Sequence, residues 1–310
     1  MKKIIITSVI SFLFVIFVSA CQALPFSSTP KKVLAIETFL ADITKEIAGD
    51  RLVVESLIPA GTDPHSFEPT PKDLVKVAES QIIVLNGAGL EEWAEELLEN
   101  ATKTKQIKIE ASEGLKPREH KDHKHDDSGG HHHHEGDPHF WLDPNLVIHY
   151  VENIRDGLIQ ADPGGKATYQ KNAEAYIGKL KELDQFIQKE VSAIPPERRL
   201  LVTNHESFGY FADRYGFQIV GTILPSFTSG ASPSAQELAR LIDQIKASKV
   251  KAIFLETGTN PQLAEQIAKE TGAKVVTDLF THSLTEPGGK APTYITMMKH
   301  NATTIVNNLK

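Results

Sequence analysis

The chain has 310 residues, 40% of them hydrophobic, which is enough for two domains with sizeable buried cores. Its formal net charge of −7 at pH 7, with no strongly basic block, argues against nucleic acid as a partner and is compatible with a cation. Cys21 is the only cysteine, which excludes a disulfide bond within the monomer.

The N-terminus is typical of an export signal. A start with two lysines precedes the largely apolar run 4–18, and Val-Ser-Ala then leads into Cys21. This ending resembles the bacterial lipobox, in which the cysteine is lipidated and becomes the first mature residue. Cleavage by ordinary signal peptidase at a neighbouring alanine, or an uncleaved anchor, are the alternatives. We expect a signal peptide over residues 1–20 and a flexible tether over residues 21–32.

Short apolar runs alternate with longer amphipathic segments from Val33 onward, which is typical of an α/β protein. In the first half the pattern predicts strands at 33–36, 52–57, 82–85 and 107–109, with helices at 38–49, 72–80 and 90–98. In the second half it predicts strands at 200–203, 218–221, 252–255 and 274–277, with helices at 208–215, 234–246 and 261–270. Two similar α/β lobes with mainly parallel sheets follow from this repetition.

The longest periodic segment begins at Lys166, after a helical segment at 145–159. Its apolar residues step by three and four, which predicts a helix of roughly 25 residues and about 37 Å. A helix packed on one lobe would show the same pattern, but one this long can also brace two. We expect an N-terminal lobe over 33–165, a linking helix over 166–194 and a C-terminal lobe over 195–310.

Residues 119–135 interrupt the pattern with seven histidines, several acids and a Gly-Gly pair. This composition cannot bury a core, but it suits loose and exchangeable binding of zinc or a similar metal. A purification tag or a merely solvated loop are the alternatives, although the run is internal and interrupted. The candidate low-affinity ligands are His120, His123, His125, His131, His132, His133 and His134.

Three isolated histidines, His65, His139 and His205, lie in or next to predicted loops. Their distribution suggests a metal site assembled from distant parts of the chain. Prolines stiffen the loop 59–71 around His65, as a preformed site requires, although a histidine that caps a turn would look the same.

Several polar residues come at or just past the carboxyl ends of predicted strands, where ligands bind in open α/β sheets. These residues are His205, Glu256 and Asp278.

Four motifs, in this order, resemble those of the metal-binding substrate-binding proteins of bacterial ABC importers, and especially the zinc-uptake branch. They are residues 63–70, 137–144, 204–211 and the segment from Asp278 to Tyr294, and the similarity covers nearly the whole mature chain. The resemblance implies two α/β lobes joined by one long helix, with the metal in the cleft between them. By resemblance the four metal ligands are His65, His139, His205 and Asp278.

The resemblance also implies zinc as the cargo. Family members with a histidine in the third motif tend to handle zinc, those with a carboxylate manganese, and here that motif carries His205. Three imidazoles and one carboxylate suit zinc better than manganese, which prefers oxygen. The implied protein is an exported monomer, in the periplasm or lipid-anchored on the outer face of the membrane, that delivers Zn²⁺ to an ABC permease and its ATPase.

Asp278 is the least certain ligand, because a water can take the fourth position in this family. Glu256 or Glu206 could accept a hydrogen bond from a ligand imidazole and orient it. His282 follows Asp278 closely and is a weaker candidate for the site. The other histidines, His149 and His300, are interpreted as structural.

Three other functions remain open at this point. A manganese-binding protein of the same family is one, and a metal-dependent surface adhesin is another. A zinc hydrolase needs an open coordination position and a positioned base, as in the H-E-x-x-H helix. His205 and Glu206 begin that motif, but the second histidine is missing, so we predict that the protein is not an enzyme.

Overall fold

The computed structural model describes residues 30–94, 98, 106–119, 136–230 and 232–310. The expected export signal, Cys21 and all seven histidines of the segment 119–135 lie outside these residues. Among the described helices, none combines the length and the apolar character needed to cross a membrane.

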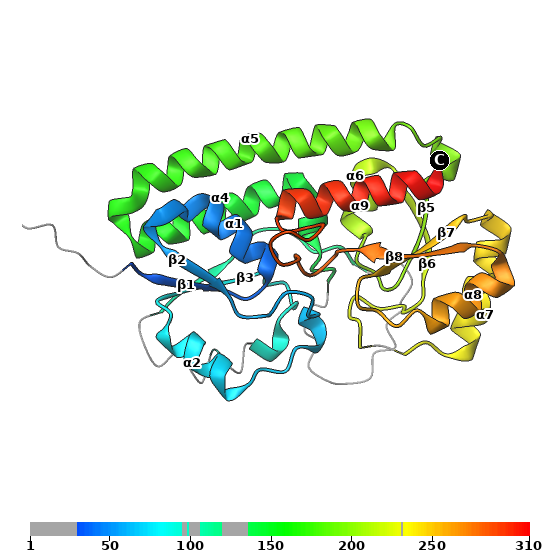
Figure 1. The fold of residues 1–310 in the computed structure, drawn as a ribbon, viewed down its shortest axis with the longest axis horizontal. Helices are drawn as coiled ribbons and strands as arrows, with labels where there is room; N and C mark the ends of the chain where they lie inside the picture. Colours follow the sequence, from blue (N-terminus) through cyan, green and yellow to red (C-terminus); the bar gives the residue numbers. More distant parts are fainter. Residues whose placement is uncertain (1–29, 95–97, 99–105, 120–135, 231) are drawn as a thin grey trace, which may run out of the picture.

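Two four-stranded sheets form the centres of two lobes, which lie side by side in Figure 1. The N-terminal lobe has the strand order β2-β1-β3-β4 and the C-terminal lobe the matching order β6-β5-β7-β8. All strand pairs within these sheets are parallel, which confirms the predicted α/β class. The strands are β1 (Lys32–Ala35), β2 (Val53–Ser56), β3 (Ile82–Leu85), β4 (Ile107–Glu110), β5 (Leu200–Thr203), β6 (Gln218–Thr222), β7 (Ala252–Glu256) and β8 (Lys274–Leu279).

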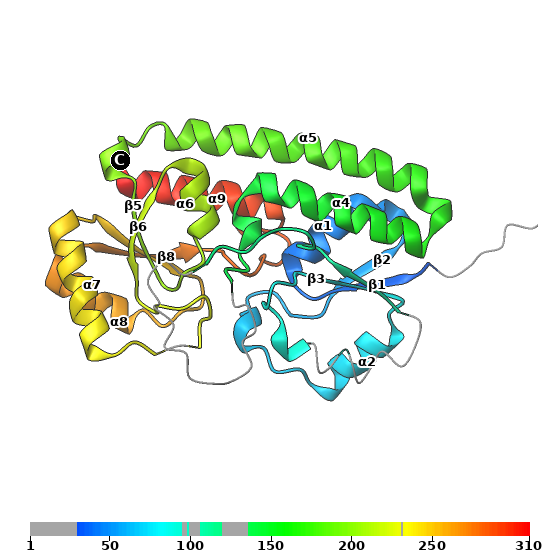
Figure 2. The same ribbon diagram turned by 180° about the vertical axis from the view of Figure 1, so that it is seen from behind.

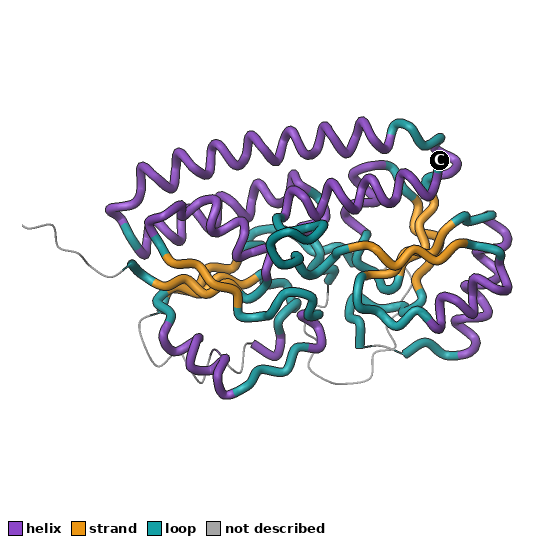
Figure 3. The backbone as a smooth tube through the Cα atoms, in the orientation of Figure 1, coloured by secondary structure: helices purple, strands orange, loops and turns teal. Residues whose placement is uncertain are grey.

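Helices cover both faces of each sheet, as parallel strands joined by crossover helices require. Figure 3 shows one helical layer above the two sheets and shorter helices below them. The helices with described bounds are α1 (Thr38–Ala48), α2 (Pro71–Glu79), α4 (Pro144–Ala161), α5 (Lys166–Val191), α6 (Gly209–Tyr215), α7 (Ala235–Ser248), α8 (Gln262–Thr271) and α9 (Tyr294–Leu309).

The predicted long helix is confirmed as α5, which extends over both lobes (Figure 1). Its apolar stripe is buried, from Tyr169 through Leu180 to Ile187, because these residues recur every three or four positions on one face. The stripe packs on α1, α4 and α9, and Figure 2 shows α4 beneath α5 from behind.

The largest apolar cluster is shared by the two lobes. It contains Phe39 of α1 and Tyr150 of α4 together with Phe211 of α6, Phe254 of β7 and Ile305 of α9. Smaller clusters lie on the far side of each sheet, under α2 in the N-terminal lobe and under α7 and α8 in the C-terminal lobe. The helical layer therefore joins the lobes through one continuous core.

Helix α9, which no segment of the predicted pattern includes, strengthens this connection. It follows the last strand of the C-terminal lobe, yet it contacts α5 and α1. The amide of Tyr294, its first residue, donates to the Asp42 carboxylate of α1 at 2.8 Å. The C-terminal segment thus returns to the N-terminal lobe.

Two buried carboxyl groups, those of Glu37 and Glu91, interact inside the N-terminal lobe. Glu91 accepts hydrogen bonds from the amides of Asn86 and Gly87. Burial raises the pKa of Glu37 well above its ordinary value, and burial raises the pKa of Glu91 to about 7. The folded protein therefore holds a proton at neutral pH that the unfolded chain releases.

We expect Glu37→Gln to stabilise the protein, and more at pH 8 than at pH 6. Folding raises the pKa of this carboxyl group, so its contribution to the stability of the folded protein falls as the pH rises through the raised pKa. The glutamine amide of the variant does not titrate. A gain of about 1 kcal/mol at pH 8 would raise the melting temperature by roughly 2–4 °C. Thermal unfolding at both pH values measures it, with exposed Glu174→Gln on α5 as the control. An equal gain at both pH values would contradict the titration.

Candidate metal centre

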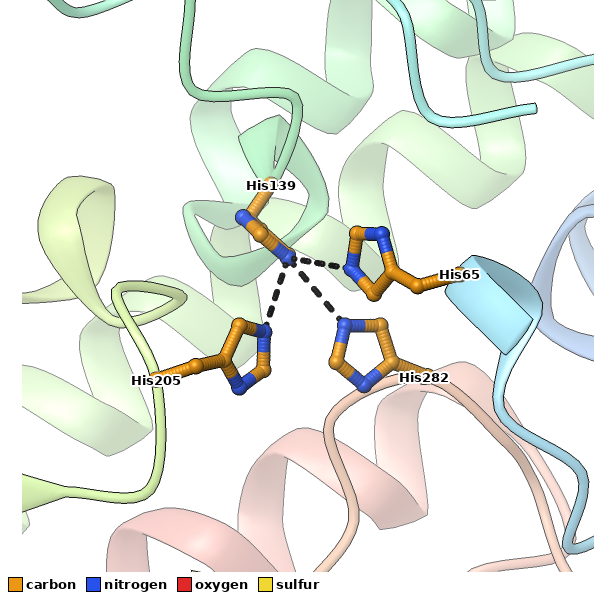
Figure 4. Close-up of side chains that lie close together, drawn as sticks. All are labelled: His65, His139, His205 and His282. Atoms are coloured by element: carbon orange, nitrogen blue, oxygen red, sulfur yellow. Dashed lines mark hydrogen bonds between the residues drawn. The ribbon is translucent and has the colours of Figure 1, made fainter. Parts of the chain in front are cut away.

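Four histidine side chains converge between the lobes: His65, His139, His205 and His282 (Figure 4). One ring nitrogen of each lies within 4.8 Å of the others. The Nε2 atom of His139 is 3.3 Å from that of His65, 3.3 Å from that of His205 and 3.1 Å from that of His282. Three of the rings are buried, and His65 is half-buried at the rim.

His65 is held by a tight turn that its own motif creates. It lies in the short 3-10 helix η2 (Pro64–Ser66), which follows β2. The Asp63 carboxylate caps this turn, because its Oδ1 accepts a hydrogen bond from the His65 amide at 2.9 Å. The Trp93 indole donates a hydrogen bond to the Pro64 carbonyl at 2.9 Å, which also holds the turn in place.

His139 uses the same Asp-Pro-His turn with one addition. The Asp137 Oδ1 atom accepts from the His139 amide at 3.0 Å and also lies 2.8 Å from the ring Nδ1. Asn86 donates to the Pro138 carbonyl at 3.1 Å. The second Asp-Pro-His therefore fixes the rotation of the imidazole as well as the backbone.

The other two rings come from loops that follow strands of the C-terminal lobe. His205 lies two residues after β5, and its Nδ1 is 2.8 Å from Oε1 of Glu256 at the end of β7. His282 lies three residues after β8, with its Nδ1 2.9 Å from the Thr281 hydroxyl. The Thr281 carbonyl accepts from the Trp141 indole at 2.6 Å, which ties this loop to the His139 segment.

The Nδ1 contacts determine what the cluster can bind. When the carboxylates of Asp137 and Glu256 each accept a hydrogen bond from an Nδ1–H group, the Nε2 lone pairs of His139 and His205 point at the centre. Converging lone pairs repel one another unless a cation lies between them. Zn–N distances of 2.0–2.1 Å in a tetrahedron give N···N separations of about 3.3–3.4 Å. The separations from His139 are close to that value.

The pKa values show which groups compete with a cation for protons. Burial lowers the pKa of His65 to about 4, and burial together with the neighbouring imidazoles lowers the pKa of His139 and His282 well below the ordinary value. Burial lowers the pKa of His205, but the carboxylates of Glu256, Asp63 and Asp137 together outweigh it, so the pKa of His205 is raised. Burial raises the pKa of Asp137 to about 8. His205 and Asp137 are therefore the groups that hold protons near neutral pH.

The structure does not bring Asp278 to this cluster. Asp278 still lies within β8, where its carboxylate accepts from Lys290 at 2.7 Å and lies 3.4 Å from His300 Nε2. Only the loop beyond the end of β8 reaches the cleft, so His282 occupies the fourth place. His149, on the surface of α4, and His300, on α9, are also outside the cluster.

Of the two glutamates considered as orienting groups, Glu256 lies at His205, whereas Glu206 faces another cavity with Asp137. From the sequence, only the position of His282 just beyond the end of a strand could have favoured it as a ligand.

A cavity of about 810 Å³ opens beside the cluster and is lined by loops of both lobes. Asp63, Ser229, Glu256 and Glu286 line it, together with His282 itself. The Asp63 carboxylate accepts a hydrogen bond from the Ser229 hydroxyl across the cavity, so the two lobes touch there. This acidic and hydroxyl-rich space offers a hydrated cation a path to the rings.

The sequence profile described as the periplasmic zinc-uptake complex component A matches residues 33–308. The manganese-binding lipoprotein MntA of Halalkalibacterium halodurans is 34% identical over 278 residues, covering 90% of this chain and 88% of that protein. The iron-binding protein YfeA of Yersinia pestis is 35% identical over 281 residues, covering 90% of this chain and 87% of that protein.

Solved structures agree with these relatives. The manganese-bound periplasmic metal binding protein of Candidatus Liberibacter asiaticus superposes with a TM-score of 0.78 at 31% identity, covering 90% of this chain and 100% of that one. The periplasmic zinc binding protein TroA of Treponema pallidum gives a TM-score of 0.79 at 26% identity, covering 90% and 99%.

Proposed function

This chain belongs to the family of the periplasmic zinc-uptake complex component A, the metal-binding components of ABC transporters, and we propose that its cargo is Zn²⁺. Members of this family are substrate-binding proteins and not enzymes, and they act outside the cytoplasm. The protein captures the ion without chemical change and passes it to a membrane permease that an ATPase drives.

The donor set supports zinc. His65, His139, His205 and His282 offer four imidazole nitrogens and no carboxylate oxygen. Zn²⁺ favours four-coordinate nitrogen and sulfur sites, whereas manganese favours oxygen ligands. The similar proteins are named for manganese, iron or zinc, so the proposal of zinc rests on the ligands of this chain itself.

The charges around the rings support a divalent ion. Neutral imidazoles bring no negative charge, and an uncompensated buried dication is costly. Asp137 and Glu256 lie behind two of the rings, and as carboxylates they bring two negative charges to balance the ion. Their contacts also fix the orientation of the rings. Loss of such a partner typically lowers metal affinity by about 10–100-fold.

Capture and delivery follow from the placement of the site. The ion enters through the cavity beside His282, and the lobes adjust only slightly because they share one core. The histidines of the segment 119–135 collect metal at lower affinity, and Cys21 carries the lipid anchor of a monomeric protein. In this proposal the N-terminal lobe covers residues 33–165, the linking helix 166–194 and the C-terminal lobe 195–310.

A competition titration tests the proposal. Calorimetry with zinc and manganese on the mature protein, and on a variant without residues 120–135, should give one tight zinc site in both. We expect zinc to bind at least about 100-fold more tightly than manganese, as the nitrogen donors predict. A preference for manganese would place the protein in the other branch of the family. Loss of the tight site with the deleted residues would show that the four-histidine cluster is not the principal binder.

A further inference from the structure

Arg118 and Asp137 pair with each other directly beside the metal centre. They form an isolated antiparallel bridge, in which the Asp137 amide donates to the Arg118 carbonyl at 2.8 Å. In the sequence, Arg118 and Asp137 stand on either side of the histidine-rich segment 119–135, and Asp137 comes two residues before the ligand His139. The backbone of the ligand segment is therefore fixed at this bridge.

The side chain of Arg118 reaches the other lobe. Its guanidinium donates to the Gly209 carbonyl at 2.6 Å and to the Asp213 carboxylate, both on α6. Its backbone amide donates to the Tyr210 hydroxyl at 3.0 Å, and that hydroxyl donates to the Asp137 carbonyl at 2.7 Å. The start of α6 is thus bound to both ends of the bridge.

The same guanidinium faces the carboxylate that orients the ligand. Arg118 Nε lies 3.7 Å from Asp137 Oδ2, and Asp137 Oδ1 lies 2.8 Å from His139 Nδ1. The Asp137 side chain is only 1% exposed, and its Oδ2 makes no hydrogen bond within the described residues. The positive charge of Arg118 therefore lies beside the buried Oδ2, while Oδ1 faces His139.

Gly209 leaves the room for this arrangement. A Cβ atom at position 209 would lie 2.7 Å from Arg118 Nε and 2.7 Å from Asp137 Oδ2. Both distances are far inside van der Waals contact, so any larger residue would push the guanidinium and the carboxylate apart. The close approach of α6 is part of how Arg118 meets Asp137.

We propose that Arg118 is a positioning residue for the metal centre: anchored on α6 of the C-terminal lobe, its guanidinium holds the Asp137 carboxylate against His139. The proposal rests on the zinc site proposed above. A surface ion pair with Asp213 alone would not have this effect, because the Asp213 side chain is 65% exposed and exposed pairs contribute about 0–1 kcal/mol.

A double-mutant cycle on the full mature protein tests this role. Zinc affinity, measured against a chromophoric chelator, should fall about tenfold in Arg118→Met and about 10–100-fold in Asp137→Asn. The double variant should bind no more weakly than Asp137→Asn alone, because Arg118 acts through that carboxylate. Asp213→Asn should bind like the parent. Additive losses in the double variant would overturn the proposal.

Gly209→Ala gives an independent test, because it keeps Arg118 and Asp137 and only separates them. It should weaken zinc binding and alter the visible absorption spectrum of the cobalt-loaded protein, which reports ligand geometry. An unchanged spectrum and affinity would contradict the role of Arg118. If the parent protein itself fails to bind zinc tightly, the proposed function fails. Tight parent binding with unaffected variants rejects only the positioning role.

Discussion

Replacing His282 by alanine should weaken zinc binding by about 100-fold or more, whereas Asp278→Ala should leave the affinity within about twofold. Four ligands share a binding free energy of about 10–16 kcal/mol, so one ligand contributes about 3 kcal/mol. His282 lies in the cluster, and Asp278 instead pairs with Lys290 outside it. Calorimetry with a competing chelator measures both variants.

His149→Ala is the matched control, since that side chain is 39% exposed on α4 and lies outside the cluster. It should bind zinc like the parent protein. The reverse result, a large loss in Asp278→Ala and none in His282→Ala, would show that the loop after β8 rearranges to present the carboxylate when the ion binds. The donor-set argument for zinc would then have to return to three imidazoles and one oxygen.

The second large effect concerns pH. Zinc affinity should fall as the medium is acidified from about pH 8 to about pH 6, by up to about 100-fold per pH unit if two protons are displaced. The pKa of His205 is raised because Glu256, with Asp63 and Asp137, outweighs its burial, and burial raises the pKa of Asp137 to about 8. A group with a raised pKa keeps its proton to higher pH, so the ion must displace that proton over this range.

His65, His139 and His282 should contribute little to this slope, because burial lowers the pKa of each. Competition titrations at half-unit steps of pH give the slope, and Asp137→Asn should reduce it by about one proton. An affinity that is flat down to pH 6 and then falls steeply would contradict this assignment. It would show instead that ordinary histidine titration controls release of the metal.

The sequence predicted the sheets well because local patterns control them. Each buried parallel strand is a short apolar run, and all eight described strands lie within two residues of their predicted bounds. His65 and His139 could be found for the same reason, since each lies in an Asp-Pro-His turn whose aspartate accepts from the histidine amide. Features that depend on a few neighbouring residues can be predicted without a structure.

The features that the sequence did not predict depend on contacts between distant segments. Helix α9 has an apolar pattern like any other helix, but its role comes from packing on α1 and α5. Asp278 and His282 are only four residues apart, and the end of β8 decides which of them faces the cleft. The pairing of Arg118 with Asp137 brings together residues on either side of the segment 119–135, which no local pattern reveals.

The core that joins the lobes determines how a permease can recognise the loaded protein. Because Phe39, Tyr150, Phe211 and Ile305 belong to one apolar cluster, opening the lobes widely would expose it to water. Empty and loaded proteins should therefore have nearly the same outline. The difference is concentrated at the rim, where Asp63 and Ser66, on either side of His65, and the loop after His282 border the cavity. A transporter that distinguishes the empty protein from the loaded one has to respond to how rigid these loops are, and not to the angle between the lobes.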